Sequence, residues 1–154
     1  MTNKITYKAL TIAYWAHREA KEAYGMPYIL HPLRVMERLD DETLKAVALL
    51  HDVVEDTDLT LEDLKKEGIP EKVLSIVDIM THREKVSYED YISRIATSPE
   101  AIAVKLADIE DNTDLSRFRD EEEMSTDKVK RRMTKYMKAR RKLLAAQEAL
   151  SKKI

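Results

Sequence analysis

One stretch of the sequence, residues 46–57, constrains the fold more than any other. It begins with an apolar run and continues with four ionisable side chains, His51, Asp52, Glu55 and Asp56. On a helix these four would share one face within about a turn and a half. Because the opposite stripe is apolar, we expect the helix to pack into a core with its polar face toward a cleft. Buried carboxylates there would take up protons or recruit a cation.

The composition predicts that the rest of the chain is helical as well. Two glycines and four prolines in 154 residues are too few for the turns of a β-sandwich or a series of hairpins. Hydrophobic residues make up 44% and charged residues 36%, as in soluble helical proteins. The length fits one domain, so we predict a single all-α domain over residues 1–154, a bundle of about eight helices.

The absence of cysteine limits the chemistry of any metal site. Without thiolates, a metal ion would be held by His, Asp or Glu side chains. The N-terminal residues lack the apolar core of a signal peptide, and no apolar run approaches the roughly 20 residues of a membrane span. We therefore expect a cytoplasmic protein without a membrane partner.

Apolar periodicity, capping residues and helix stop signals predict the helix boundaries. Gly25 is expected to end the first helix, Pro32 to start the second with His31 as its N-cap, and Thr60 to open a capping box. The predicted helices span residues 4–24, 32–39, 42–56, 61–67, 70–81, 88–98, a segment starting at 99, and a long basic helix capped at 125–127.

Four side chains from three of these helices could ligate one metal ion: His31, His51, Asp52 and Asp108. Two imidazoles and two carboxylates suit manganese, iron or zinc and leave positions open for water and a phosphate oxygen. Glu55 and Asp56 follow one turn later, where they could move protons to or from that water. Taken singly, each residue has an ordinary structural interpretation, such as a cap or an isolated polar pair. Their combination is more specific.

Three motifs carry a resemblance to a known family: Tyr28-Ile29-Leu30-His31-Pro32, the block from His51 to Thr57, and Lys105-Leu106-Ala107-Asp108 followed by Asn112. They resemble the HD-domain metal-dependent phosphohydrolases, and more closely the hydrolase domain of the RelA/SpoT alarmone enzymes and its small stand-alone relatives. The resemblance covers residues 13–136. It implies an α-helical bundle that binds one manganese ion.

The resemblance also implies roles for individual residues. His31, His51, Asp52 and Asp108 would be the metal ligands, and Glu55 and Asp56 the catalytic acids. Asn112 would lie near the ribose of the substrate or near the water on the metal. The family often carries an Arg and a Tyr one turn apart that contact phosphates, and Arg132 and Tyr136 have this spacing. Lys85 is a further possible phosphate contact.

Two positions depart from the family pattern. The segment before the Pro-Tyr-x-x-His-Pro motif commonly carries an Arg-Lys-Asp run that packs on guanine, whereas this chain reads Glu22-Ala23-Tyr24. Arg18, one turn earlier, could substitute for it, and Tyr24 could stack on a base or pack at the helix end. Asp111 stands where the larger enzymes often have an aromatic residue or His. The identity of the base therefore stays open.

Charge is distributed unevenly near the C-terminus. Residues 106–127 hold nine acids and two bases, whereas residues 128–154 hold eleven bases and one acid. One interpretation is a solvated helix face that pairs with acidic neighbours. The other is a surface that attracts phosphates.

The leading hypothesis is a manganese-dependent hydrolase that removes the 3′-pyrophosphate of guanosine tetra- or pentaphosphate, without a synthetase domain. A second hypothesis keeps the metal but changes the substrate to a 5′-nucleotide or a 2′-phosphorylated dinucleotide. A third is a non-catalytic module that binds a nucleotide or RNA through the basic helix. A small nucleotide is the expected partner rather than nucleic acid. The oligomeric state stays open, a homodimer included.

Overall fold

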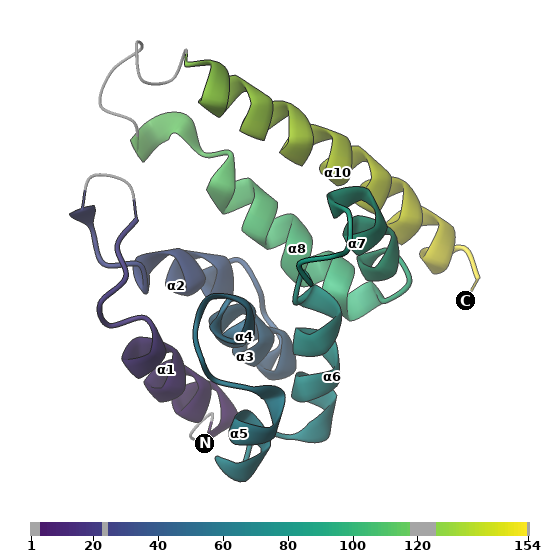
Figure 1. Cartoon of the computed structure of the whole chain (residues 1–154). Coiled ribbons are helices and arrows are strands. Elements are labelled where there is room, and N and C mark those ends of the chain that lie inside the picture. Colours follow the sequence, from purple (N-terminus) through teal and green to yellow (C-terminus); the bar gives the residue numbers. More distant parts are fainter. Residues whose placement is uncertain (1–3, 23–24, 118–125, 154) are drawn as a thin grey trace.

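The computed structural model describes residues 4–22, 25–117 and 126–153, and within them the chain forms helices and no strand (Figure 1). The all-α prediction is confirmed. None of the helices in this part of the chain combines the length and apolarity that a membrane span requires. The helices are α1 (Lys4–Ala16), α2 (Leu30–Glu37), α3 (Glu42–Leu50), α4 (Val53–Asp56), α5 (Leu61–Lys66), α6 (Glu71–Met80), α7 (Tyr88–Ile95), α8 (Pro99–Asn112) and α10 (Asp127–Ser151), with a 3-10 turn η2 at Leu115–Arg117.

Helix α3 is the centre of the bundle. Its last five residues, 46–50, are fully buried, and it packs against α1, α2, α6 and α8. Figure 1 shows α3 enclosed between α1 and α2 on one side and α6 and α8 on the other. Each fully buried leucine there stabilises the fold by roughly 1.5–3 kcal/mol. The apolar half of the 46–57 stretch thus anchors its ionisable half in the middle of the molecule.

Helix α10 lies along the outside of the bundle, beside α8 and α7 (Figure 1). Ala139 and Leu143 are its buried residues, and most of its bases are exposed. The N-terminal half of α10 consequently runs past the end of α8 that carries Asp108 and Asn112.

The first helix is shorter than predicted and ends at Ala16 instead of residue 24. The chain then turns, and residues 20–22 pair with residues 26–28: Tyr28 N donates to Ala20 O at 2.9 Å and Glu22 N donates to Met26 O at 2.8 Å. Gly25, with a φ of 74°, serves this turn and not a helix end. We call residues 20–28 the hairpin; Tyr24 lies outside the described residues.

The second helix begins earlier than predicted, at Leu30 with Ile29 as its N-cap. His31 is therefore a helical residue and not the cap, and Pro32 is the third residue of the helix. Proline is tolerated there because the first turn has free N–H groups, so no hydrogen bond is lost.

The central helix is interrupted, although the sequence predicted one helix over residues 42–56. Helix α3 ends at Leu50 and α4 starts at Val53. Nδ1 of His51 donates to the carbonyl oxygen of Ala48 at 2.6 Å. In an unbroken helix that oxygen would accept from the N–H of Asp52, so the imidazole competes with the helix at the point where it stops.

Other predicted helix starts are confirmed by their caps. The capping box of Thr60 and Asp63 opens α5, and side-chain oxygens of Ser87, Ser98 and Thr126 accept N–H bonds at the starts of α7, α8 and α10. These caps involve only residues close in sequence, so they favour a helix start at the same place in any tertiary fold.

The cap of α8 yields a stability prediction. Ser98 Oγ accepts from the N–H of Ala101 at 3.2 Å. Ser98→Ala leaves that donor unpaired and should lower the free energy of unfolding by about 1 kcal/mol, measured by chemical denaturation. Ser75→Ala is the matched control, since Ser75 is exposed within α6 and its loss should change stability by less than about 0.5 kcal/mol. Equal effects of the two substitutions would contradict the role of the cap.

Candidate metal centre

The four proposed ligands converge at the centre of the bundle. His31 comes from α2, His51 and Asp52 from the break between α3 and α4, and Asp108 from α8. Nε2 of His31 lies 2.9 Å from Oδ1 of Asp108, and Nε2 of His51 lies 3.3 Å from the same oxygen. Oδ2 of Asp52 lies 3.1 Å from Nε2 of His51 and 3.8 Å from Nε2 of His31. The structure therefore brings all four together.

Both imidazoles direct the same ring nitrogen toward the carboxylates. Nδ1 of His51 donates to the Ala48 carbonyl, and Nδ1 of His31 donates to Oδ2 of Asp111 at 2.7 Å. In a neutral ring, Nε2 then carries a lone pair. Nε2 of His51 is buried and makes no hydrogen bond of acceptable geometry within the described residues. A lone pair that faces carboxylate oxygens is satisfied when a cation is shared between them.

The two carboxylates have partners of their own. The hydroxyl of Tyr28 donates to Oδ2 of Asp52. Nζ of Lys105 donates to Oδ2 of Asp108 at 2.8 Å, and Nδ2 of Asn112 donates to Oδ1 of Asp108 at 3.2 Å. Each proposed ligand is thus oriented by a second group, as metal ligands in proteins usually are.

The charges in the cluster favour a cation. Burial alone would lower the pKa of His31, but its hydrogen bonds to Asp108 and Asp111 raise it to about 9. Burial alone would raise the pKa of Asp52, but His51 lowers it to about 2. Positive charge is therefore stabilised between the carboxylates. Two imidazoles and two carboxylates fit a divalent ion, which could replace a proton there.

His31, Asp52 and Asp108 of the cluster line a cleft of about 400 Å³, which we call the central cleft. Glu55, Asp56, Asn112, Arg132 and Tyr136, all predicted from the sequence, line it. Lining residues that the sequence did not suggest as site residues are His82, Tyr88, Tyr91, Lys105 and Lys135. The central cleft therefore holds acids, bases and aromatic rings around the proposed ligands.

Glu55 and Asp56 lie beside the proposed ligands, since oxygens of Asp52, Glu55 and Asp56 come within 4.8 Å of one another. Oε1 of Glu55 accepts from the backbone N–H of His82 at 2.7 Å, which fixes that carboxylate. Desolvation and the charges of Asp52 and Glu55 raise the pKa of Asp56 to about 6. Near neutral pH the carboxyl of Asp56 can thus exchange a proton readily.

Helix α10 adds two cations, Arg132 and Lys135, to the central cleft. Arg132, Lys135 and Tyr136 line it, and Nζ of Lys135 lies 4.6 Å from the ring centre of Tyr88 and 5.0 Å from that of Tyr136. Desolvation and the charges of Lys105 and Arg132 lower the pKa of Lys135. These groups form a positive surface close to the negative cluster.

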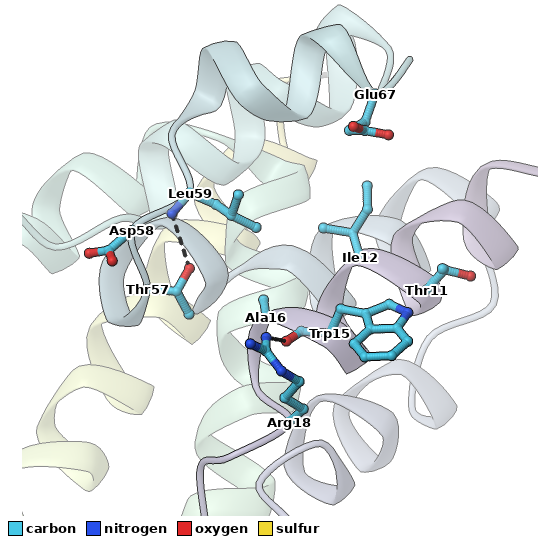
Figure 2. Close-up of a pocket in the computed structure, with 9 residues that line it drawn as sticks. All are labelled: Thr11, Ile12, Trp15, Ala16, Arg18, Thr57, Asp58, Leu59 and Glu67. Carbon is cyan, nitrogen blue, oxygen red and sulfur yellow. Dashed lines mark hydrogen bonds between the residues drawn. The ribbon is translucent and has the colours of Figure 1, made fainter.

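Two predicted substrate contacts are not among the residues that line the central cleft. Lys85 is exposed in the turn before α7. Arg18 lines a separate pocket of about 510 Å³ between α1 and the segment Thr57–Leu59, where its guanidinium donates to the carbonyl of Trp15 at 2.6 Å (Figure 2). That pocket is larger, but its lining has no imidazole and no carboxylate of the cluster, so we place the chemistry in the central cleft.

Some of the unpredicted residues left a signal in the sequence. Lys105 interrupts an apolar stretch three residues before Asp108, the spacing of an ion pair on a helix, and it is buried against that carboxylate. Tyr88 and Lys135 lie far apart in the sequence and meet only through packing of α10. No local pattern could have paired them.

Comparison with known proteins identifies the family. The model of the HD domain family matches residues 7–113. The chain belongs to the HD domain family. HD domains are metal-dependent, and the His and Asp cluster described above can hold a metal ion.

Other HD proteins are similar over most of this chain. It is 41% identical over 118 residues to the guanosine-3′,5′-bis(diphosphate) 3′-pyrophosphohydrolase of Aquifex aeolicus, covering 68% of this chain and 17% of that protein. It is 36% identical over 115 residues to the GTP pyrophosphokinase of Streptomyces coelicolor, covering 66% and 13%. The chain thus spans less than a fifth of the length of these relatives.

A solved structure is similar over almost the full length. It is described as "A metazoan ortholog of SpoT hydrolyzes ppGpp and plays a role in starvation responses", and it matches with a TM-score of 0.70 and 26% identity. The match covers 97% of this chain and 94% of that one. The HD bundle expected from the sequence is therefore confirmed.

The geometry of the cluster predicts the effect of one isosteric change. Asp52→Asn keeps an acceptor for the Tyr28 hydroxyl but removes the negative charge. The dissociation constant for Mn²⁺ should therefore rise by more than about 100-fold, beyond the 10- to 100-fold effect usual for an outer partner. Isothermal titration calorimetry measures it. Asp58→Asn, an exposed acid on the same segment, is the control and should bind as the unsubstituted protein does. Equal affinities of both variants would count against Asp52 as a ligand.

Proposed function

We propose that this HD protein is a metal-dependent phosphohydrolase that removes the 3′-pyrophosphate of guanosine tetra- and pentaphosphate. The observation that carries the proposal is the composition of the central cleft: a cluster able to hold a cation, two further acids beside it, and cations of α10 opposite. The names of the relatives and of the solved structure support this substrate. A module that only binds nucleotides would have no use for the two further acids.

In this proposal His31, His51, Asp52 and Asp108 hold the metal ion, and we propose Mn²⁺. The ion would supply Lewis-acid activation of water and of a phosphoryl group. Glu55, fixed by the His82 N–H, takes the proton of the attacking water. Asp56, whose pKa of about 6 keeps a protonated fraction available, gives a proton to the leaving oxygen.

The remaining lining residues bind and orient the substrate. Arg132 and Lys135 offer guanidinium and ammonium donors to phosphate oxygens, and the Tyr136 hydroxyl lies one turn from Arg132. Asn112 donates to Asp108, so its position is tied to that of a ligand. We keep Asn112 as a contact to the ribose or the nearby water.

The proposal predicts that the protein with Mn²⁺ and guanosine tetraphosphate releases pyrophosphate, and that Glu55→Gln slows this release by about 10²- to 10⁴-fold. Pyrophosphate is followed by a coupled assay, and Mn²⁺ affinity by calorimetry should change much less than for Asp52→Asn. Glu62→Gln, an exposed acid of α5, serves as the control. Absence of pyrophosphate from the unsubstituted protein with Mn²⁺, Mg²⁺ or Zn²⁺ would refute the proposal.

The cations of α10 should affect substrate affinity more than turnover. Arg132→Ala removes a charge-assisted donor whose solvent exposure limits its contribution, so KM should rise by about tenfold with a smaller change in kcat. Arg131→Ala, one residue away, exposed and outside the lining of the central cleft, is the matched control. If both substitutions raised KM equally, the effect would be the overall charge of the helix and not a specific contact.

One observation favours keeping a second nucleotide as an alternative substrate. Glu22, in the segment where the family carries a basic run, forms a two-pronged ion pair with Arg34 at 3.1 and 2.7 Å. Because Glu22 pairs with Arg34, this segment would give the base of the substrate different surroundings from those of a basic run. The same assay with a 5′-nucleotide and a 2′-phosphorylated dinucleotide separates the candidates by kcat/KM.

A further inference from the structure

Asp111 is a fully buried carboxylate of α8 that contacts His31, one of the proposed ligands. Donors from three side chains converge on it: Nδ1 of His31 at 2.7 Å, Nε and a terminal nitrogen of Arg34 at 2.7 and 3.2 Å, and a guanidinium nitrogen of Arg38 at 3.3 Å. A buried carboxylate is costly without such partners. The two arginines thus hold in place an anion whose Oδ2 also faces the imidazole of His31.

The contacts continue outward to the hairpin. Arg34 donates to both oxygens of Glu22 through its terminal nitrogens while its Nε donates to Asp111. The four residues form a continuous series, Glu22 to Arg34 to Asp111 to His31. A guanidinium is planar and rigid, so it fixes the orientation of both carboxylates that it joins.

The geometry at Asp111 determines which nitrogen of His31 carries the proton. Oδ1 of Asp111 accepts from Nε of Arg34 and from Arg38, whereas Oδ2 accepts from a terminal nitrogen of Arg34 at 3.2 Å and lies 2.7 Å from Nδ1 of His31. An ionised carboxylate only accepts hydrogen bonds, so Nδ1 must be the donor and Nε2 is left for the cluster. An uncharged amide at the same place would not impose this choice.

We infer that Asp111 is a positioning residue that sets the tautomer and ring orientation of His31 for metal binding, and that Arg34 and Glu22 hold Asp111 in that role. This inference rests on the metal site of the proposed function. Asp111 does not line the central cleft, so it acts through His31 and not on the substrate. Glu22, at the outer end of the series, lies in the hairpin. The series therefore connects the hairpin to the metal centre.

The test is Asp111→Asn. Two arginine donors meet at Oδ1 and one at Oδ2, so the oxygen of the new amide is favoured at the Oδ1 position. The NH₂ group then faces Nδ1 of His31, which opposes the tautomer that ligation needs. The dissociation constant for Mn²⁺, measured by calorimetry, should rise about 10- to 100-fold. In the zinc-loaded protein, the downfield imidazole N–H signal of His31 in the NMR spectrum should shift upfield and exchange faster with water.

The control is Glu110→Gln, which changes the preceding residue of α8, an exposed acid 3.7 Å from Arg38, and should alter neither measurement. Because Asp111→Asn could prevent folding, Glu22→Gln provides a second variant that keeps the buried carboxylate. It should produce a smaller loss of Mn²⁺ affinity and a smaller shift of the same N–H signal. Unchanged affinity and N–H signal in either folded variant would overturn the inference.

The two proposals fail in different ways. If the unsubstituted protein bound Mn²⁺ but released no pyrophosphate, the proposed function would be wrong, while the role of Asp111 could still be decided from affinity and the N–H signal. If the unsubstituted protein bound neither Mn²⁺ nor Zn²⁺, the metal site itself would be wrong and the inference would be overturned with it.

Discussion

The burial of Asp52 and Asp108 against two imidazoles is the constraint on which the rest of the structure depends. Removing ions from water costs several kcal/mol each unless partners compensate, so each charge requires a neighbour. Helix α8 supplies many of them, since Lys105, Asp108, Asp111 and Asn112 recur at helical spacing on its buried side. Because α8 packs against α2, α3 and α6, this row of polar side chains enters the core beside the imidazoles of His31 and His51.

The interruption between α3 and α4 has a chemical consequence. Because His51 donates to the Ala48 carbonyl, the chain changes course just after the buried run of α3. His51 and Asp52 stay with the buried cluster, whereas Glu55 and Asp56 on α4 reach the solvent-facing side of the central cleft. A regular helix would have given all four a similar environment. The break separates two side chains suited to hold a cation from two suited to exchange protons with a substrate.

The sequence predicted what depends on nearby residues. The caps at Thr60 and at residues 125–127 located the starts of α5 and α10 to within a residue, and the motif around His51 located the cluster. The errors arose where distant residues compete with local propensity. Residues 17–24 have a helical pattern, but the hairpin pairs Ala20 with Tyr28. Likewise, the partnership of Asp111 with His31 joins positions 80 residues apart, and sequence alone could only mark Asp111 as unusual.

The uneven charge of the C-terminal region allowed two interpretations, and the structure assigns them to different parts of α10. Arg140 and Arg141 belong to an exposed face, as expected for a solvated helix. Arg132 and Lys135 instead line the central cleft, where Lys105 adds a third positive charge. Desolvation, together with repulsion from the like charges of Lys105 and Arg132, lowers the pKa of Lys135. An anion with several phosphates would relieve that repulsion, so this one turn of α10, and not the net charge of the helix, supports a polyphosphate substrate.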